Sequence, residues 1–192
     1  PAENHTLNFI LTGAPQWHMQ NYQSRIDVLQ RYGSDDKPNR RYNSNWGYLN
    51  GEKTSQSVNY YSKPVMSLNW DWKISENSKL SSVLYGSWGR GGGTGVLGSI
   101  VGRGVNAQGV SVTNSKGIND AAFKDANGLI RYDDIYRFNQ GTGTFAWNSN
   151  GVDYTAVNQT PGIGTRTNGL TRRAHINSHD WYGFLTNFQH KI

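Results

Sequence analysis

The sequence has no cysteine, few charged residues and no long hydrophobic run. The absence of cysteine among its 192 residues excludes disulfide frameworks, cysteine-based zinc sites and thiol catalysis. Charged residues make up only 17% of the chain, and the mean hydropathy is -0.72. No stretch approaches the ~18 consecutive apolar residues of a membrane helix. The lack of such a run excludes a membrane helix but not a transmembrane β-strand, because only every second residue of such a strand faces lipid.

The net charge of +6 and the abundance of Trp and Tyr leave two interpretations open. A basic, aromatic-rich chain can bind nucleic acid, but Lys and Arg also collect on solvated loops, where they could face the phosphates of lipopolysaccharide. We favour the second interpretation and expect no nucleic-acid partner. The chain starts at Pro1 without a signal peptide, and it ends at Ile192 within an alternating pattern. We therefore expect a piece of a longer protein.

Alternation with a period of two residues predicts four β-strands. Large apolar side chains occupy every second position from Met66 to Ile74, and polar side chains occupy the positions between them. This pattern is typical of a strand with one apolar and one polar face. The predicted strands are residues 5–14, 59–75, 79–90 and 180–192.

The connections between these strands differ greatly in length. The turn at 76–78 is tight, whereas 15–58 and 91–178 are long links. Compact soluble domains rarely contain structureless links beyond ~15 residues, but outer-membrane barrels combine short turns on one side with long loops on the other. We therefore predict an all-β chain that is a segment of a large antiparallel transmembrane β-barrel. It has about four strands, short periplasmic turns and two long extracellular loops.

One short helix is expected in the first long loop. Ser24 and Asp27 imitate a capping box, and Gly33 could end the helix. Its packed stripe would consist of Tyr22, Ile26 and Leu29.

Several segments together resemble the barrel of TonB-dependent outer-membrane receptors. They are GAPQWHMQ after the first strand, RYNSNWGYLNGE in the first loop, KPVMSLNWDWKI in the second strand, the glycine-rich KLSSVLYGSWGRGGGTG and the returning HDWYGFLTN. Residues 96–175 are not part of the resemblance. It implies a barrel of about 22 strands with a plugged lumen, of which this chain would supply under a quarter. The plug domain and the energy-coupling segment have no counterpart here.

Two polar clusters could suggest a metal site. His175 and His179 are four residues apart, a spacing that suits metal binding on a helix, but we expect a loop entering a strand there. The run from Asp125 to Gly128 resembles part of a calcium loop but lacks its closing glutamate, so we expect a turn. We expect no metal and no cofactor.

Neither of the other candidate motifs predicts catalysis. The glycine run GRGGGTG is not followed by the residues of a phosphate loop. The overlapping stretch RGGGTGVLGS, which opens the second long loop, indicates mobility or unusual backbone angles. Asp133 and Asp134 are adjacent, and adjacent side chains of a strand point in opposite directions. We expect no catalytic residue.

Binding is therefore assigned to the polar strand face and to the aromatic and basic residues of the first loop. Aromatic residues and arginine are the usual anchors of binding sites, although the same residues could simply pack the loops together. The candidate ligand-binding residues are Trp17, His18, Arg40, Arg41, Tyr42, Trp46, Tyr48, Asn69 and Asp71.

The leading functional hypothesis is TonB-driven import of a scarce nutrient across the outer membrane. Ferric siderophore, cobalamin, glycan and peptide all stay open as cargo. The expected partners are outer-membrane lipid and lipopolysaccharide, the rest of the barrel with its plug, and the TonB complex, and a surface lipoprotein is a further candidate. One alternative is an extracellular β-rich module for glycan binding or adhesion, and another is part of a secreted enzyme. A soluble module must bury its apolar strand face against a second sheet, whereas a barrel exposes it to lipid.

Overall fold

The computed structural model describes residues 3–159 and 168–192. Strands hold 59% of the residues and helices 9%, which confirms the predicted all-β class. Within the described ranges, no helix is long and apolar enough to cross a membrane. The chain forms two compact units: unit 1 comprises 1–18, 59–93 and 175–192, and unit 2 comprises 19–58 and 94–174.

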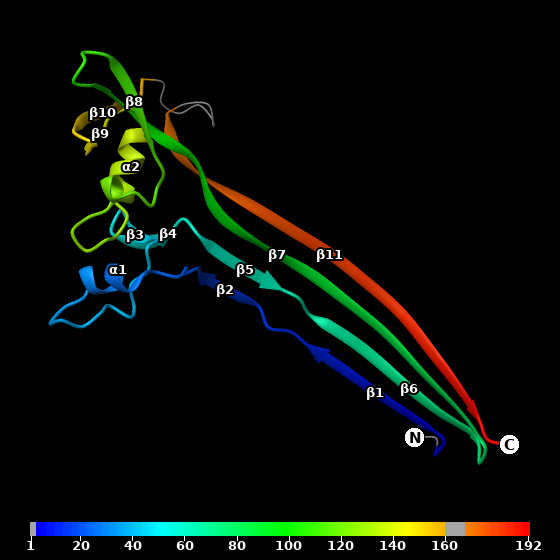
Figure 1. The fold of residues 1–192 in the computed structure, drawn as a ribbon. Coiled ribbons are helices and arrows are strands. Elements are labelled where there is room, and N and C mark those ends of the chain that lie inside the picture. The colour runs from blue at the N-terminus through cyan, green and yellow to red at the C-terminus, as the bar shows by residue number, and fades with distance from the viewer. Residues whose placement is uncertain (1–2, 160–167) are drawn as a thin grey trace. The chain divides into compact units, whose positions relative to one another are not determined.

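Unit 1 is built on four antiparallel strands in the order β1-β6-β7-β11 (Figure 1). They are β1 (His5–Thr12), β6 (Val65–Ser75), β7 (Ser78–Val105) and β11 (Gly169–His190), and both β7 and β11 continue into unit 2. A short strand, β5 (Val58–Ser62), pairs with β7 in the same register as β6, and β2 (Gln16–Met19) pairs with β5.

The four predicted strands exist, but their bounds differ. The predicted strand 59–75 is divided into β5 and β6 at Lys63-Pro64, although the Pro64 carbonyl still accepts a hydrogen bond from the Trp88 amide at 3.3 Å. The predicted strands 79–90 and 180–192 are parts of the much longer β7 and β11. The glycine-rich run 90–99 was expected to open a loop, but it lies inside β7. The unusual backbone angle predicted for it is confirmed at Gly98, which has a φ of 96°.

The register of unit 1 places large apolar side chains opposite one another. Phe9 of β1 pairs with Leu68 of β6, and Leu68 pairs with Leu84 of β7. Because directly paired residues share a face of a sheet, one face is apolar across neighbouring strands. The other face carries polar pairs such as Asn8 with Asn69. The apolar face comprises Leu7, Phe9, Leu11, Met66, Leu68, Trp70, Trp72, Leu80, Leu84, Trp88, Tyr182, Phe184 and Phe188.

Unit 2 contains several short elements where long loops were predicted. Its hairpins are β3 (Trp46–Leu49) with β4 (Glu52–Ser55) and β9 (Thr144–Ser149) with β10 (Val152–Val157). Strand β8 (Ser111–Lys116) pairs with the far end of β7. The helices are α1 (Ile26–Arg31), the single 3-10 turn η1 (Ala121–Phe123) and α2 (Tyr132–Asn139).

A hydrophobic core holds unit 2 together. Phe123 and Phe138 are fully buried, and both pack against Phe145, with ring centroids 4.8 and 5.6 Å apart. The segments predicted as two long loops therefore contain a core of their own, because they bury their own apolar side chains as a domain does. The core consists of Ile100, Ile118, Phe123, Ile130, Ile135, Phe138, Phe145, Ala156 and Leu170.

The two helices of unit 2 correct the sequence-based expectations in different ways. Helix α1 lies where a helix was predicted, but Arg25 is its N-cap and makes no side-chain cap, and none of its residues is buried. The expected packed stripe is wrong, since Tyr22 and Ile26 are exposed. Helix α2 was not predicted. Asp133 and Asp134 do not lie in a strand. They lie in the first turn of α2, where carboxylates stabilise the positive end of the helix dipole.

Candidate functional site

The β3–β4 hairpin brings Trp46, Tyr48 and Lys53 together on one face. Its turn is Asn50-Gly51, with φ of 52° and 80°, the left-handed backbone that a two-residue hairpin turn of this kind requires. The turn pairs Tyr48 with Lys53. Trp46 shares their face of the hairpin, and the Lys53 Nζ lies 3.1 Å from the centroid of its indole ring.

This face of the hairpin forms one side of a pocket of about 280 Å³, here called the hairpin pocket. Four of the predicted binding residues line it, namely Arg41, Tyr42, Trp46 and Tyr48. The pocket therefore unites cations, aromatic rings and amides in a single concave site, as small-molecule sites do. Its other lining residues are Asn39, Asn43, Gly47, Lys53, Asn127 and Leu129.

Tyr42 is a structural wall of this pocket. It is only 4% exposed, its hydroxyl donates to the Gly128 carbonyl at 3.0 Å, and its ring stacks on Tyr32. Lys124 donates to the Tyr42 hydroxyl at 3.0 Å and to the Ser44 carbonyl at 3.2 Å. Burial raises the pKa of Tyr42 and lowers the pKa of Lys124. Tyr42, expected at a loop surface, instead holds the pocket together.

The remaining predicted residues do not line the hairpin pocket. Trp17 and His18 lie in β2 and are exposed, and Arg40 is also exposed. Asn69 and Asp71 lie on the polar face of β6 in unit 1. Asp71 accepts a hydrogen bond from the Ser81 hydroxyl at 2.5 Å and forms an ion pair with Lys79 at 3.1 Å.

The glycine run of β7 permits close packing within unit 1. A Cβ atom at Gly89 would overlap the His179 ring, and one at Gly92 would overlap the His175 carbonyl oxygen. Together with Lys63, Tyr61 and neighbouring residues, the run lines a hollow of about 320 Å³. Glycine is required at positions 89 and 92 because a side chain would overlap β11.

The two polar clusters that could suggest a metal site have other roles. His175 and His179 lie in β11, where four residues span ~13 Å, too far for both rings to hold one ion. The predicted turn at Asp125 is confirmed, since the Asp125 carboxylate accepts from the backbone amides of Asn127 and Leu129 at 2.9 and 2.8 Å. No cluster of three or more potential metal ligands occurs in the described part of the chain.

Tyr132 was missed by sequence reasoning and connects α2 to the hairpin. Its hydroxyl donates to the Asn45 carbonyl at 2.6 Å and accepts from the Gln56 amide at 2.8 Å. It lines a second, largely apolar pocket of about 160 Å³ together with Ile135 and Leu170. Burial raises the pKa of Tyr132 to about 12.

Alkaline pH is expected to destabilise unit 2 through Tyr132. Between the unfolded pKa of ~10 and the folded pKa of about 12, the folded state retains a proton that the unfolded state releases, so stability falls as pH rises. The loss should reach about 2 kcal/mol near pH 12. Urea unfolding between pH 9 and 11.5 measures it. Tyr132→Phe should reduce this dependence, leaving the smaller contribution of Tyr42, whereas Tyr136→Phe, an exposed position of the same helix, should preserve it. Equal pH dependence in both variants would contradict the assignment.

Comparison of the chain with protein-family models, with curated proteins and with solved structures finds no match in any of the three.

Proposed function

We propose that this chain is a segment of a transmembrane β-barrel in the outer membrane, from a TonB-dependent transporter that imports a scarce nutrient. The two-faced sheet of unit 1 carries this proposal. Leu7, Phe9 and Phe184 are 66%, 58% and 62% exposed on its apolar face. Soluble monomers rarely expose a contiguous apolar patch above a few hundred Å², whereas lipid is the natural solvent for such a face.

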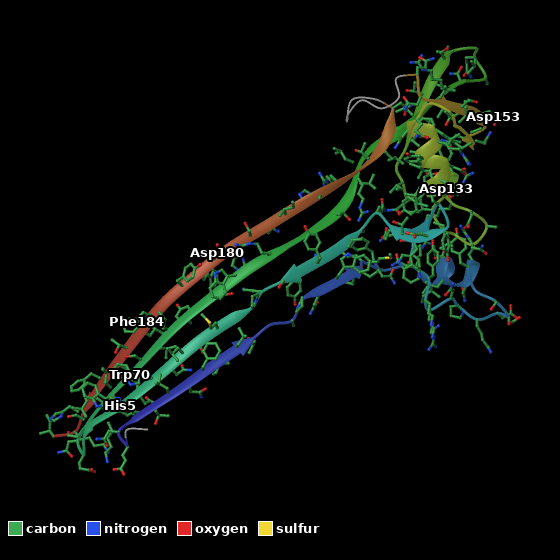
Figure 2. All side chains as sticks on the ribbon, turned by 180° about the vertical axis from the view of Figure 1, so that it is seen from behind. His5, Trp70, Asp133, Asp153, Asp180 and Phe184 are labelled. Atoms are coloured by element: carbon green, nitrogen blue, oxygen red, sulfur yellow. The ribbon has the colours of Figure 1, made fainter. Side chains whose placement is uncertain are left out.

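Aromatic side chains mark both ends of the apolar face. Near the 76–77 turn, His5 of β1 lies beside Trp70 of β6 (Figure 2), and its ring stacks on Trp70 and Trp72 with centroids 5.8 and 5.4 Å apart. At the other end, Trp88 donates from Nε1 to the Tyr182 hydroxyl at 2.8 Å. Aromatic girdles flank the lipid-facing band of outer-membrane barrels in this way.

Strand length and open edges agree with a barrel. Strand β6 has 11 residues, and a tilted strand needs ~9–11 to span a bilayer. Among the described residues of unit 1, β1 pairs only with β6, and β11 pairs only with β7. Each unpaired backbone group would cost several kcal/mol in lipid, so the remaining strands of the barrel are the expected partners of both edges.

The alternative of a soluble glycan-binding or adhesion module requires a second sheet over the apolar face. Within the described residues of unit 1, all strands belong to one sheet, and the face stays exposed. This arrangement favours the barrel over the soluble module.

The strand directions support one orientation in the membrane. Strands β6 and β7 are joined by the tight 76–77 turn, and β1 starts at the same end, where the Asn4 carbonyl accepts from the Lys73 amide at 2.8 Å. Short turns are periplasmic in such barrels. The segments of unit 2 are connected to the opposite ends of these strands, and we place them on the cell exterior.

Cysteine labelling of intact bacteria tests this orientation, because these 192 residues contain no cysteine and any cysteine elsewhere in the full-length protein can first be replaced by serine. In the full-length protein, an impermeant maleimide should label Ala126→Cys, an exposed position of unit 2, in intact cells. It should label Asn77→Cys only after lysis. Leu68→Cys should resist labelling in both cases, because lipid covers it.

Two results would contradict the proposal. Labelling of Asn77→Cys alone in intact cells would invert the orientation. Strong labelling of Leu68→Cys, at the rate of Ala126→Cys, would show that water reaches the apolar face and would favour the soluble module.

A further inference from the structure

We propose that the hairpin pocket binds a carboxylate-bearing ligand with a flat, partly apolar body. This inference deepens the proposed function and rests on it only for the role of the ligand as cargo, because binding itself can be measured without transport. The pocket lies within unit 2, so all of its lining residues belong to one compact unit.

Two cations of the pocket have no acidic partner. Arg41 and Lys53 both line it, and neither is in an ion pair with any residue of the described ranges. No acidic residue lines the pocket. The Asp125 carboxylate accepts from two backbone amides, and Glu52 precedes Lys53 in β4, so that its side chain points to the other face of the hairpin. The lining therefore carries two positive charges and no carboxylate.

The identity of the cations favours a carboxylate. The planar guanidinium of Arg41 can donate two parallel hydrogen bonds to both oxygens of one carboxylate. Lys53 supplies a point charge that is held over the Trp46 ring. The Trp46 Nε1 group at the same wall is buried without an acceptor, so this wall is rich in donors and poor in acceptors.

The other walls fit an uncharged ring. Tyr48 is half exposed on the hairpin face, and Leu129 adds an apolar surface. The Tyr48 hydroxyl and the Asn127 side-chain amide make no hydrogen bond within the described structure, so both can bind a ligand hydroxyl. A volume of about 280 Å³ holds a single substituted ring with its acid group.

The test uses the full-length protein in detergent micelles, with 4-hydroxybenzoate as the probe and titration calorimetry as the measurement. The neutral 4-hydroxybenzamide has the same ring and hydroxyl without the charge, and it should bind at least about tenfold more weakly. Lys53→Gln and Arg41→Gln should each weaken benzoate binding by about tenfold or more and leave benzamide binding unchanged. Lys37→Gln is the matched control, because it removes the same charge at an exposed position outside the pocket.

Three results would overturn the inference. They are equal affinities for the acid and the amide, equal effects of Lys53→Gln and Lys37→Gln, and tighter binding of inorganic phosphate than of the carboxylate. Failure of the proposed function has a different signature. If the protein binds the acid but Leu68→Cys is labelled from water, the pocket assignment stands and the transporter assignment falls.

Discussion

Replacing Phe138 by alanine is expected to destabilise unit 2 by about 3–5 kcal/mol, the usual cost of deleting a buried aromatic ring. Phe138 is 0% exposed, lies in α2 and packs against Phe145 of β9. Its removal leaves a cavity where helix and hairpin meet. Hydrogen–deuterium exchange of peptides from α2 and β9 should show faster exchange throughout both elements.

Tyr136→Ala provides the control for this experiment. It removes an aromatic ring of similar size from the same helix, but Tyr136 is 52% exposed. Its cost should stay below about 1 kcal/mol. If both variants exchange at the wild-type rate, the segments of unit 2 are loops as the sequence had suggested, and the core described above does not hold them together.

The second large effect is expected on the apolar face of unit 1. If unit 1 is part of a barrel as proposed, Leu68→Arg should destabilise the full-length protein by about 2–4 kcal/mol, because it would place a charge on the lipid-facing side of a strand near the middle of the membrane. Leu68 lies centrally in β6, between Phe9 of β1 and Leu84 of β7. Denaturant titration in micelles measures the loss.

Asn69→Arg is the matched variant, one residue further along the same strand. Asn69 faces the polar side, where its amide donates long hydrogen bonds of 3.4 Å to the Asn8 carbonyl and 3.5 Å to the Ser67 hydroxyl. Its replacement should cost much less than that of Leu68. Equal losses at the two positions would refute the assignment of the two faces, and a larger loss at Asn69 would reverse it.

The strands that sequence reasoning located best are those with unbroken alternation. From Met66 to Ile74 every second residue is large and apolar, and this stretch lies in β6 as predicted. The strands predicted in place of β7 and β11 are too short, because the alternation of apolar and polar residues fades along both. The glycine run interrupts the pattern in β7, and polar residues occupy both faces of β11 between 171 and 179. There the pairing of the backbone, rather than side-chain burial, defines the strand.

Unit 2 was missed for a different physical reason. Its core residues, such as Ile118, Phe123 and Ile130, lie in short apolar stretches with Asn, Asp, Lys and Gly between them. Such spacing has neither the period of a strand nor that of a helix. Contacts distant in sequence unite these residues, as between Phe123 and Phe145.

The candidate site was predicted in part. Arg41, Tyr42, Trp46 and Tyr48 come together because they are close in sequence. Lys53 could have been added, because Asn50-Gly51 is a strong signal for a two-residue hairpin turn that pairs position 48 with 53. Asn127 and Leu129 could not, since only the folded unit brings the 125–129 turn to the hairpin.

The close approach of Gly92 and His175 has a consequence for how this chain can change over time. These two residues are neighbours in the sheet of unit 1, yet more than eighty positions separate them in sequence. The segment 93–174 is therefore a single insertion into the sheet, and its two ends are adjacent. Each doubling of such an insertion costs only ~0.6 kcal/mol of closure entropy. The strands can therefore stay constant while the inserted segment, which supplies Asn127 and Leu129 to the hairpin pocket, lengthens, shortens or is replaced.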